Sequence, residues 1–383
     1  MGAGFDDVTL DELYRRRSYK WRAYPPDVLP AFVAEMDFQL APPVTAAIIE
    51  AATTGDCGYA WPTAELGASL SEFAQHRFSW YVDPADVVLI PDVMAGVLEL
   101  LRLLCEPGDG VVINTPVYPP FFSHIEEARC RVVEAPLALG PRGYELDLEA
   151  VEAAFRNGAR VYLLCNPHNP TGRVFSRQEL QRVAELAERH NVVVLADEIH
   201  APMALPGATH VPFLTLGEPA VSRCVAFASA SKAWNIPGLK CAQAVVAADP
   251  MRAVVGRLRE DVVFRSGHVG VLASIAAYRD GVTWLDDLIA VLDRNRTLMR
   301  ELLAEFLPGA GYVTPEGGYL GWIDCRGLAV DGEPASVFLD RGRVALRPGV
   351  DFGANGMGFV RVTMGTTAEI LREIVVRMRA AVA

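Results

Sequence analysis

Short apolar runs alternate with stretches of helical periodicity through the middle of the chain, and this alternation is the strongest restriction on its fold. Strands are predicted at residues 87–90, 111–114, 131–134, 161–165, 192–196, 224–228 and 243–247. Several of these runs are apolar throughout, as strands covered on both faces of a sheet require. Helices are predicted between them at 94–105, 177–190 and 251–259, the second opened by a capping box of Ser176 and Glu179. The pattern therefore predicts an α/β domain with a mostly parallel sheet.

The pattern changes after about residue 281. We expect one long helix over 283–306, a Pro/Gly-rich stretch at 307–318, strands at 319–324, 344–346 and 359–363, and a last helix at 368–382. Thr366 and Glu369 are expected to form the capping box of that last helix. The sequence thus predicts three parts: an N-terminal segment over 1–43 that packs with the small domain, a large domain over 44–281, and a small α+β domain over 282–383.

Composition and charge indicate which classes of binding partner to expect. The 383 residues carry a net charge of −12, and no Lys/Arg run is dense enough to follow a phosphate backbone, so nucleic acid and anionic membranes are not expected as partners. Residues 1–10 lack the apolar core of a signal peptide, and no apolar stretch is long enough to span a bilayer. The seven cysteines are scattered and form no Cys-x-x-Cys pair. We therefore expect a cytoplasmic protein without a metal or a disulfide framework.

Lys232 lies in the motif Ser229-Ala-Ser-Lys-Ala-Trp-Asn-Ile-Pro-Gly-Leu-Lys240, directly after the predicted strand at 224–228. This position is near the carboxyl end of a strand, where open α/β sheets bind ligands. A single lysine is most often a solvated surface residue. Here, however, Ser229, Ser231 and Lys240 could hold a phosphate beside an amine able to form a Schiff base.

Three further polar motifs follow predicted strands. Asp197, in Val192-Val-Val-Leu-Ala-Asp-Glu-Ile-His200, could cap a helix or keep a pyridine nitrogen protonated. Asn169, in Asn166-Pro-His-Asn-Pro-Thr-Gly172, could belong to an ordinary turn or donate to a phenolate oxygen on a cofactor ring. Residues 91–96 precede a helix, and amides at a helix N-terminus favour phosphate.

The order of these motifs resembles that of fold-type I pyridoxal-phosphate (PLP) enzymes of the aminotransferase class I/II superfamily, over nearly the whole chain. Within it, the chain looks most like the cystathionine β-lyase (C–S lyase) branch, which includes maltose-regulon modulators. The motifs that carry this likeness are Lys20-Trp21, Phe32-Val-Ala-Glu-Met-Asp-Phe38, Asn114-Thr-Pro-Val-Tyr-Pro-Pro-Phe121, Asn166-Pro-His-Asn-Pro-Thr-Gly172 and Ala196-Asp-Glu-Ile-His200. The resemblance implies an aspartate aminotransferase-like fold with a mostly parallel seven-stranded sheet in the large domain, and PLP as cofactor.

The resemblance also implies roles around the cofactor ring. Lys232 is expected to carry PLP as a Schiff base and to act as base for the α-proton, and Asp197 to pair with the pyridinium. Tyr118 is expected to stack on the ring, and Asn169 to contact its O3′. His200 stands where ordinary aminotransferases usually have a tyrosine that shares this contact, and an imidazole can change charge near neutral pH.

The remaining implied roles concern the phosphate and the substrate. The expected phosphate ligands are the amides of Met94 and Ala95 and the side chains of Ser229, Ser231 and Lys240. Tyr59 is expected to reach the phosphate of the neighbouring subunit, which implies a homodimer with shared active sites. Arg361 is expected to bind the substrate α-carboxylate in a bidentate manner, with Ala34 and Asn169. Without the resemblance, Tyr59 and Tyr118 would be packing residues and Arg361 a solvated residue on a strand.

PLP enzymes share a substrate carbanion, and the protein decides its fate. We favour C–S cleavage of L-cystathionine or a related cysteine S-conjugate to a thiol, pyruvate and ammonia. Residues 93–95, Val-Met-Ala, lack the glycine usual in aminotransferases, which favours the lyase branch. Two alternatives stay open: an aminotransferase of amino acids, and a PLP-binding regulatory protein that acts through protein contacts.

Overall fold

A seven-stranded sheet forms the centre of the computed structural model, which describes residues 4–140 and 143–382. Its order is β2-β10-β9-β8-β7-β3-β4, with β2 (Val87–Ile90), β3 (Gly110–Ile113), β4 (Arg131–Glu134), β7 (Ala159–Cys165), β8 (Val193–Asp197), β9 (Cys224–Ala228) and β10 (Ala242–Val245). Strand β10 runs antiparallel to its two neighbours, and the other pairs are parallel. The predicted mostly parallel sheet is confirmed, with strand ends shifted by at most two residues.

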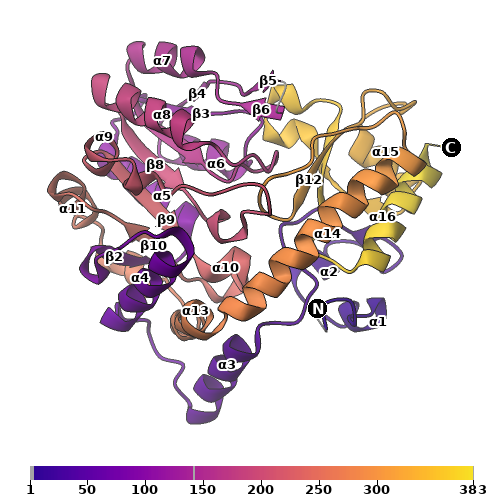
Figure 1. Ribbon diagram of the computed structural model, residues 1–383, viewed down its shortest axis with the longest axis horizontal. Coiled ribbons are helices and arrows are strands. Elements are labelled where there is room, and N and C mark those ends of the chain that lie inside the picture. The colour runs from indigo at the N-terminus through magenta and orange to yellow at the C-terminus, as the bar shows by residue number, and fades with distance from the viewer. Residues whose placement is uncertain (1–3, 141–142, 383) are drawn as a thin grey trace.

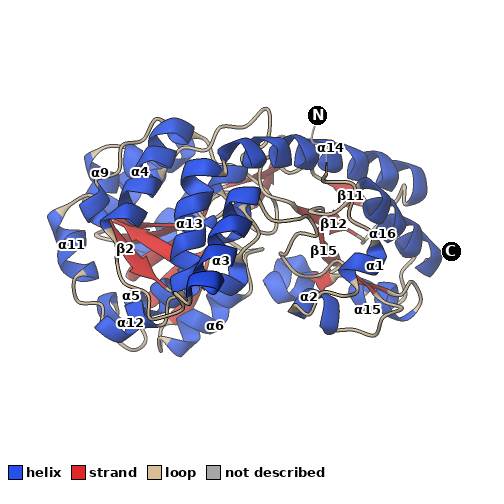
Figure 2. Ribbon diagram, turned by 90° about the horizontal axis from the view of Figure 1, so that it is seen from below, coloured by secondary structure: helices blue, strands red, loops and turns tan. Residues whose placement is uncertain are grey.

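Helices cover both faces of this sheet, which explains why its strands are apolar throughout (Figures 1 and 2). Along β7, Val161 and Leu163 pack into one core, and Tyr162 and Leu164 pack into the core on the opposite face. Successive side chains of a strand point to opposite faces, so a strand buried on both sides must be apolar at every position.

The helices of this larger body are α3 (Pro42–Thr54), α4 (Ala64–Phe78), α5 (Val93–Leu104), α6 (Pro120–Glu127), α7 (Leu148–Arg156), α8 (Arg177–Arg189), α9 (Glu218–Val221), α10 (Ala230–Ala233), α11 (Asp249–Val255), α12 (Glu260–Phe264) and α13 (His268–Asp280). A hairpin of β5 (Ala138–Gly140) and β6 (Gly143–Glu145) completes it. Side chains of α5 and α6 pack against one face of the sheet, and those of α8 and α13 against the other.

The smaller body is built on a four-stranded antiparallel sheet of order β11-β12-β15-β14. Its elements are β11 (Gly311–Tyr312), β12 (Leu320–Asp324), β14 (Arg347–Pro348), β15 (Phe359–Thr363), α15 (Pro334–Asp340) and α16 (Ala368–Ala381). The N-terminal elements α1 (Leu10–Leu13), α2 (Tyr19–Arg22) and β1 (Leu29–Pro30) lie beside it, and β1 pairs with β13 (Val344–Ala345). Leu13 and Trp21 share a hydrophobic core with Met299 and Val362.

One long helix, α14 (Val282–Phe306), runs from the larger body to the smaller one (Figure 2). Leu285 and Leu288 pack in the core of the larger body, and Met299 and Leu302 in that of the smaller one. We propose the predicted parts 1–43, 44–281 and 282–383 as the domains, with α14 contributing to both cores.

Two local predictions need correction. The helix expected at 251–259 is instead α11, which ends at Val255 before Gly256, and α12 is a separate short helix. The N-cap of α16 is Thr367, whose side chain accepts from the amide of Ile370 (3.2 Å), while the Thr366 hydroxyl is buried without a partner among the described residues. The capping box of α8 is confirmed.

Two further properties of the described residues bear on function. No helix within 4–140 and 143–382 combines the length and the apolar character that crossing a membrane requires. Within the same ranges, no cluster of His, Cys, Asp and Glu could hold a metal ion.

Candidate active site

Five strands of the large sheet end in loops that carry polar side chains. Asp92 follows β2, Tyr118 follows β3, Asn169 follows β7, Asp197 ends β8 and Lys232 follows β9. Because β2 is parallel to β3, β7, β8 and β9, these loops meet at one edge of the sheet. The five side chains line a single cavity of about 320 Å³. Four further predicted residues line it as well: Met94, His200, Ser231 and Lys240. The other predicted site residues, Ala34, Tyr59, Ala95, Ser229 and Arg361, are not part of its lining.

The amine of Lys232 is held by the N-terminal segment. Its Nζ donates to the carbonyl oxygen of Ala34 (2.9 Å), and the hydroxyl of Tyr319 donates to the same oxygen (2.9 Å). Burial, assisted by the positive charge of Arg361, lowers the pKa of Lys232 to about 8. A larger fraction of this amine is therefore neutral near pH 7 than of an ordinary lysine, which favours nucleophilic attack.

Asp197 is a buried carboxyl group at the end of β8. Burial raises its pKa to about 6, although the hydrogen bond from the amide of Ile199 (3.1 Å) and the charge of Lys232 act in the opposite direction. Near neutral pH the group is mostly ionised. The cavity therefore holds a buried negative charge that a cationic ring nitrogen would compensate.

His200 follows Asp197 by three residues and is equally buried. Burial, and then the positive charge of Lys232, lower the pKa of His200 to about 3. The imidazole is therefore neutral at physiological pH, and the prediction that it can change charge there is wrong. Its Nδ1 is buried without a hydrogen-bond partner among the described residues.

Arg361 connects the smaller body to the cavity. Its Nη1 donates to Oδ1 of Asn169 (3.1 Å) and its Nη2 to the carbonyl oxygen of Phe32 (2.9 Å). The guanidinium carbon lies 5.1 Å from the ring centroid of Phe352. Burial lowers the pKa of Arg361 to about 10, so it remains charged. The side chain is 5% exposed, which excludes the alternative of a solvated arginine.

Asp92 organises the end of the cavity where the phosphate was predicted. As N-cap of α5 it accepts from the amide of Ala95 through Oδ1 (2.8 Å) and from Nζ of Lys240 through Oδ2 (2.9 Å). Although burial acts to raise it, the pKa of Asp92 is lowered by these two bonds. The amide of Ala95 is thus used by its own helix cap in this structure, and its contact to a phosphate stays a prediction.

The two serines of the lysine motif, Ser229 and Ser231, have different positions relative to the cavity. The Ser229 hydroxyl donates to the carbonyl oxygen of Cys241 (2.7 Å) and accepts from the amide of Ser231 (3.1 Å). Ser229 therefore caps α10 and does not line the cavity, whereas Ser231 does. A phosphate contact from the Ser229 side chain would replace one of these bonds, and it stays a prediction.

Tyr59 lies away from the cavity of its own chain. It is 84% exposed, and its ring centroid is 5.8 Å from that of Phe264.

Tyr118, in contrast, lines the cavity, and burial raises its pKa. His168, in the same motif as Asn169, has both ring nitrogens within hydrogen-bond distance of backbone carbonyl oxygens and is buried.

Three residues that the sequence did not single out belong to this site. Asp92 sits at the N-cap position before a helix, a signal that could have identified it. His124 lines the cavity from α6, with Nδ1 2.9 Å from the carbonyl oxygen of Pro120. Tyr319 reaches Ala34 from the smaller body, and no local pattern marks such a contact across two domains.

A lysine with a lowered pKa and a buried carboxylate line one cavity, and a buried arginine is hydrogen-bonded to Asn169 at its wall. Such a set of groups is typical of an enzyme site for a small ligand. Residues 33–378 match the family described as aminotransferase class I and II. The chain therefore belongs to this family.

Its relatives are similar over almost the whole chain. It is 44% identical to a Mycobacterium leprae protein named "Putative cystathionine beta-lyase", over 97% of this chain and 96% of that protein. It is 33% identical to cystathionine beta-lyase PatB of Bacillus subtilis, over 93% of this chain and 92% of that protein. The crystal structure of a PLP-bound C-S lyase from Staphylococcus hominis superposes with a TM-score of 0.89 at 26% identity, over 100% of both chains. The predicted superfamily, branch and aspartate aminotransferase-like fold are thus confirmed.

Proposed function

We propose that this chain is a PLP-dependent C–S β-lyase that cleaves L-cystathionine or a related cysteine S-conjugate to a thiol, pyruvate and ammonia. The observation that carries the proposal is a buried lysine amine, with its pKa lowered to about 8, in one cavity with the buried carboxylate of Asp197. Relatives named as cystathionine β-lyases, similar over more than nine tenths of the chain, support the reaction type.

Pyridoxal phosphate matches the chemistry of the residues around the cavity. Asp197 would hold the ring nitrogen, because its buried negative charge has only the Ile199 amide as hydrogen-bond donor among the described residues. Lys232 offers an amine to the aldehyde, and Tyr118 an aromatic face. Lys240, Ser231 and the amide of Met94 would hold the phosphate. When bound, the cofactor supplies an electron sink for a carbanion at the substrate α-carbon.

The chain's own residues then bind the substrate and move its proton. Arg361 offers two N–H donors to the α-carboxylate, in exchange for its bonds to Asn169 and Phe32. Lys232, once free, takes the α-proton on Nζ, and the carbonyl oxygen of Ala34 holds the resulting ammonium. His200 stays neutral and can share a hydrogen bond without adding charge.

The overall reaction balances without an oxidant. The β-carbon–sulfur bond breaks, the thiolate leaves with the electron pair of that bond, and it takes up one proton. The remaining aminoacrylate adds one water and releases ammonia and pyruvate. For L-cystathionine, the products are homocysteine, pyruvate and ammonia.

The complete site is proposed to need two chains. Four large side chains are exposed on α3, on α12 and in the connection between α3 and α4: Ile49 (60%), Tyr59 (84%), Trp61 (65%) and Phe264 (40%). Exposed apolar groups of this size often mark an interface. A second copy seated there would cover them and bring Tyr59 to the neighbouring cavity, as the resemblance implies.

The free cysteines bear on the proposed location. All seven cysteines are unpaired, and five of them are buried. Disulfides are rare in reducing compartments, so this state fits a protein of the cytoplasm.

An assay without any keto-acid acceptor tests the function. The enzyme is incubated with L-cystathionine, and pyruvate and free thiol are followed together. Equal and sustained release of both is expected. Turnover that needs an added keto acid would make the protein an aminotransferase, and absence of turnover with bound cofactor would favour a regulatory protein.

A further inference from the structure

A segment of the smaller body crosses to the larger body beside the cavity. This crossing segment, residues 313–319, joins β11 to β12 and lies between two loops of the large sheet. The amide of Glu316 donates to the carbonyl oxygen of Gly172 (2.8 Å), and its own carbonyl oxygen accepts from the amide of Leu205 (2.8 Å). The two loops are those that carry Asn169 and His200.

The crossing segment packs tightly against the larger body at Gly172 and Gly317. A Cβ on Gly172 would lie 2.2 Å from Cβ of Pro315, and a Cβ on Gly317 would lie 3.0 Å from side-chain atoms of Pro167 and Val174. Gly172 also has φ +69°, which favours glycine. A side chain at Gly172 or Gly317 would therefore push the crossing segment away from the loop that follows Asn169.

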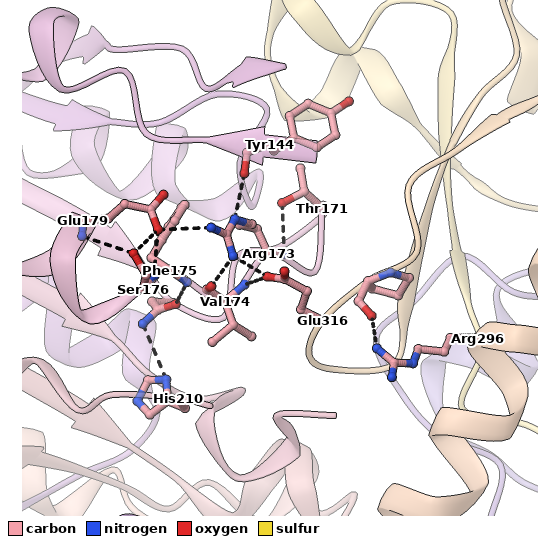
Figure 3. Close-up of polar contacts among 12 residues, drawn as sticks. Tyr144, Thr171, Arg173, Val174, Phe175, Ser176, Glu179, His210, Arg296 and Glu316 are labelled. Atoms are coloured by element: carbon pink, nitrogen blue, oxygen red, sulfur yellow. Dashed lines mark hydrogen bonds and ion pairs between the residues drawn. The ribbon is translucent and has the colours of Figure 1, made fainter. Parts of the chain in front are cut away.

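Arg173 joins the two bodies through an ion pair next to this contact (Figure 3). The side chain is nearly buried, and its Nε donates to the carbonyl oxygen of Tyr144 (2.9 Å). Nη2 donates to Glu179 (3.0 Å), and Nη1 donates to Oε2 of Glu316 (2.5 Å). The same oxygen of Glu316 accepts from the amide of Val174 (2.9 Å).

The two carboxylates that hold Arg173 differ in where they come from. Glu179 lies on α8, in the same body as Arg173, whereas Glu316 belongs to the smaller body. Strand β12 follows the crossing segment directly and pairs with β15, with Trp322 opposite Arg361. Glu316 is thus connected to Arg361 through one pair of neighbouring strands.

We propose that the Arg173–Glu316 ion pair is a positioning device for substrate: it fixes Arg361 at the cavity so that the α-carboxylate of an amino acid is bound. This inference rests on the proposed function, in which Arg361 is the carboxylate ligand. The Arg173 side chain is buried and has few alternative partners, whereas the Glu316 side chain is 35% exposed. Loss of the Glu316 carboxylate therefore removes the charged bond between the two bodies and leaves only the packing and the backbone hydrogen bonds of the crossing segment to hold it.

Binding of unreactive ligands to the holoenzyme tests the proposal. L-alanine has no β-leaving group, and L-alaninamide lacks the carboxylate; both are titrated by the change in visible absorbance of the bound cofactor. In Glu316→Gln we expect the Kd of L-alanine to rise about tenfold, since small misplacements of binding groups are costly. The Kd of L-alaninamide is expected to change less than about twofold, because that ligand does not use the carboxylate site.

Two controls separate positioning from a structural role. Glu179→Gln weakens the same arginine within one body, and should lower the melting temperature while leaving the ratio of the two Kd values unchanged. In Arg361→Lys, adding Glu316→Gln should weaken L-alanine no further, since both changes act through one group. Equal weakening of both ligands in Glu316→Gln, or no change in either, would overturn the proposal. A wild-type holoenzyme without any spectral response to L-alanine would instead overturn the proposed function.

Discussion

Lys232 differs from a surface lysine in one measurable property, the pH at which its amine loses its charge. Burial lowers its pKa to about 8. The fraction of the amine that is neutral therefore rises about tenfold per pH unit below pH 8 and levels off above it. The rate at which PLP forms its visible chromophore with the cofactor-free protein should follow the same curve. Stopped-flow absorbance measures this rate, with Nα-acetyllysine as the reference amine, and Lys232→Ala should form no chromophore. A rate that keeps rising from pH 9 to pH 10 would contradict the lowered pKa.

The raised pKa of Asp197 leads to a second prediction at the scale of one residue, which concerns the stability of the cofactor-free protein. Its pKa is raised from 3.8 to about 6 in the folded, cofactor-free protein, so folding takes up a proton between these values and stability falls as the pH rises through them. Asp197→Asn should therefore stabilise the cofactor-free protein at pH 7, by up to about 3 kcal/mol at 1.36 kcal/mol per unit. The gain should shrink below pH 6, and the variant should lose activity. Denaturant melts at pH 5 and pH 7 measure this, with exposed Asp287→Asn as the control; an equal gain at both pH values would refute the argument.

At the scale of one element, the N-terminus of α5 combines a helix cap with the cavity. Asp92→Ala should lower the free energy of unfolding by about 1 kcal/mol, because the Ala95 amide loses its acceptor. Asp92→Asn keeps that bond but removes a negative charge beside Lys240, so PLP should bind severalfold more tightly to the cofactor-free variant. Pyridoxal, which lacks the phosphate, is the matched ligand, and its affinity should not change. Equal effects on PLP and pyridoxal would show that Asp92 does not act at the phosphate.

At the scale of the whole molecule, the exposure of Tyr59 predicts complementation between two inactive variants. If Tyr59 serves the neighbouring chain, a heterodimer of Tyr59→Ala and Lys232→Ala contains one site with both residues intact. Random mixing gives half heterodimers, so about a quarter of wild-type activity should return after joint refolding. Activity assays and sedimentation measure the outcome. Each variant alone is the control, and an active monomer in sedimentation would refute shared sites.

The sequence anticipated the cavity well because its residues sit at strand ends. Asp197, Asn169 and Lys232 each follow an apolar run, and parallel strands bring their ends to one edge whatever the details of packing. Ala95 and Ser229 each take part in a helix cap, which depends on side-chain rotamers that a motif does not specify. Their contacts to a phosphate stay predictions.

The sequence by itself determined the layers of this protein: runs apolar at every position require a sheet covered on both faces, and the motifs after them fix which side chains meet at its edge. Only the tertiary structure decided the charges and the contacts between the two bodies. The pKa values of Lys232 and His200 follow from burial among groups distant in the chain. The hydrogen bond of Tyr319 to Ala34 and the ion pair of Arg173 with Glu316 join residues more than 140 positions apart. A local sequence pattern does not predict which residues so far apart come into contact.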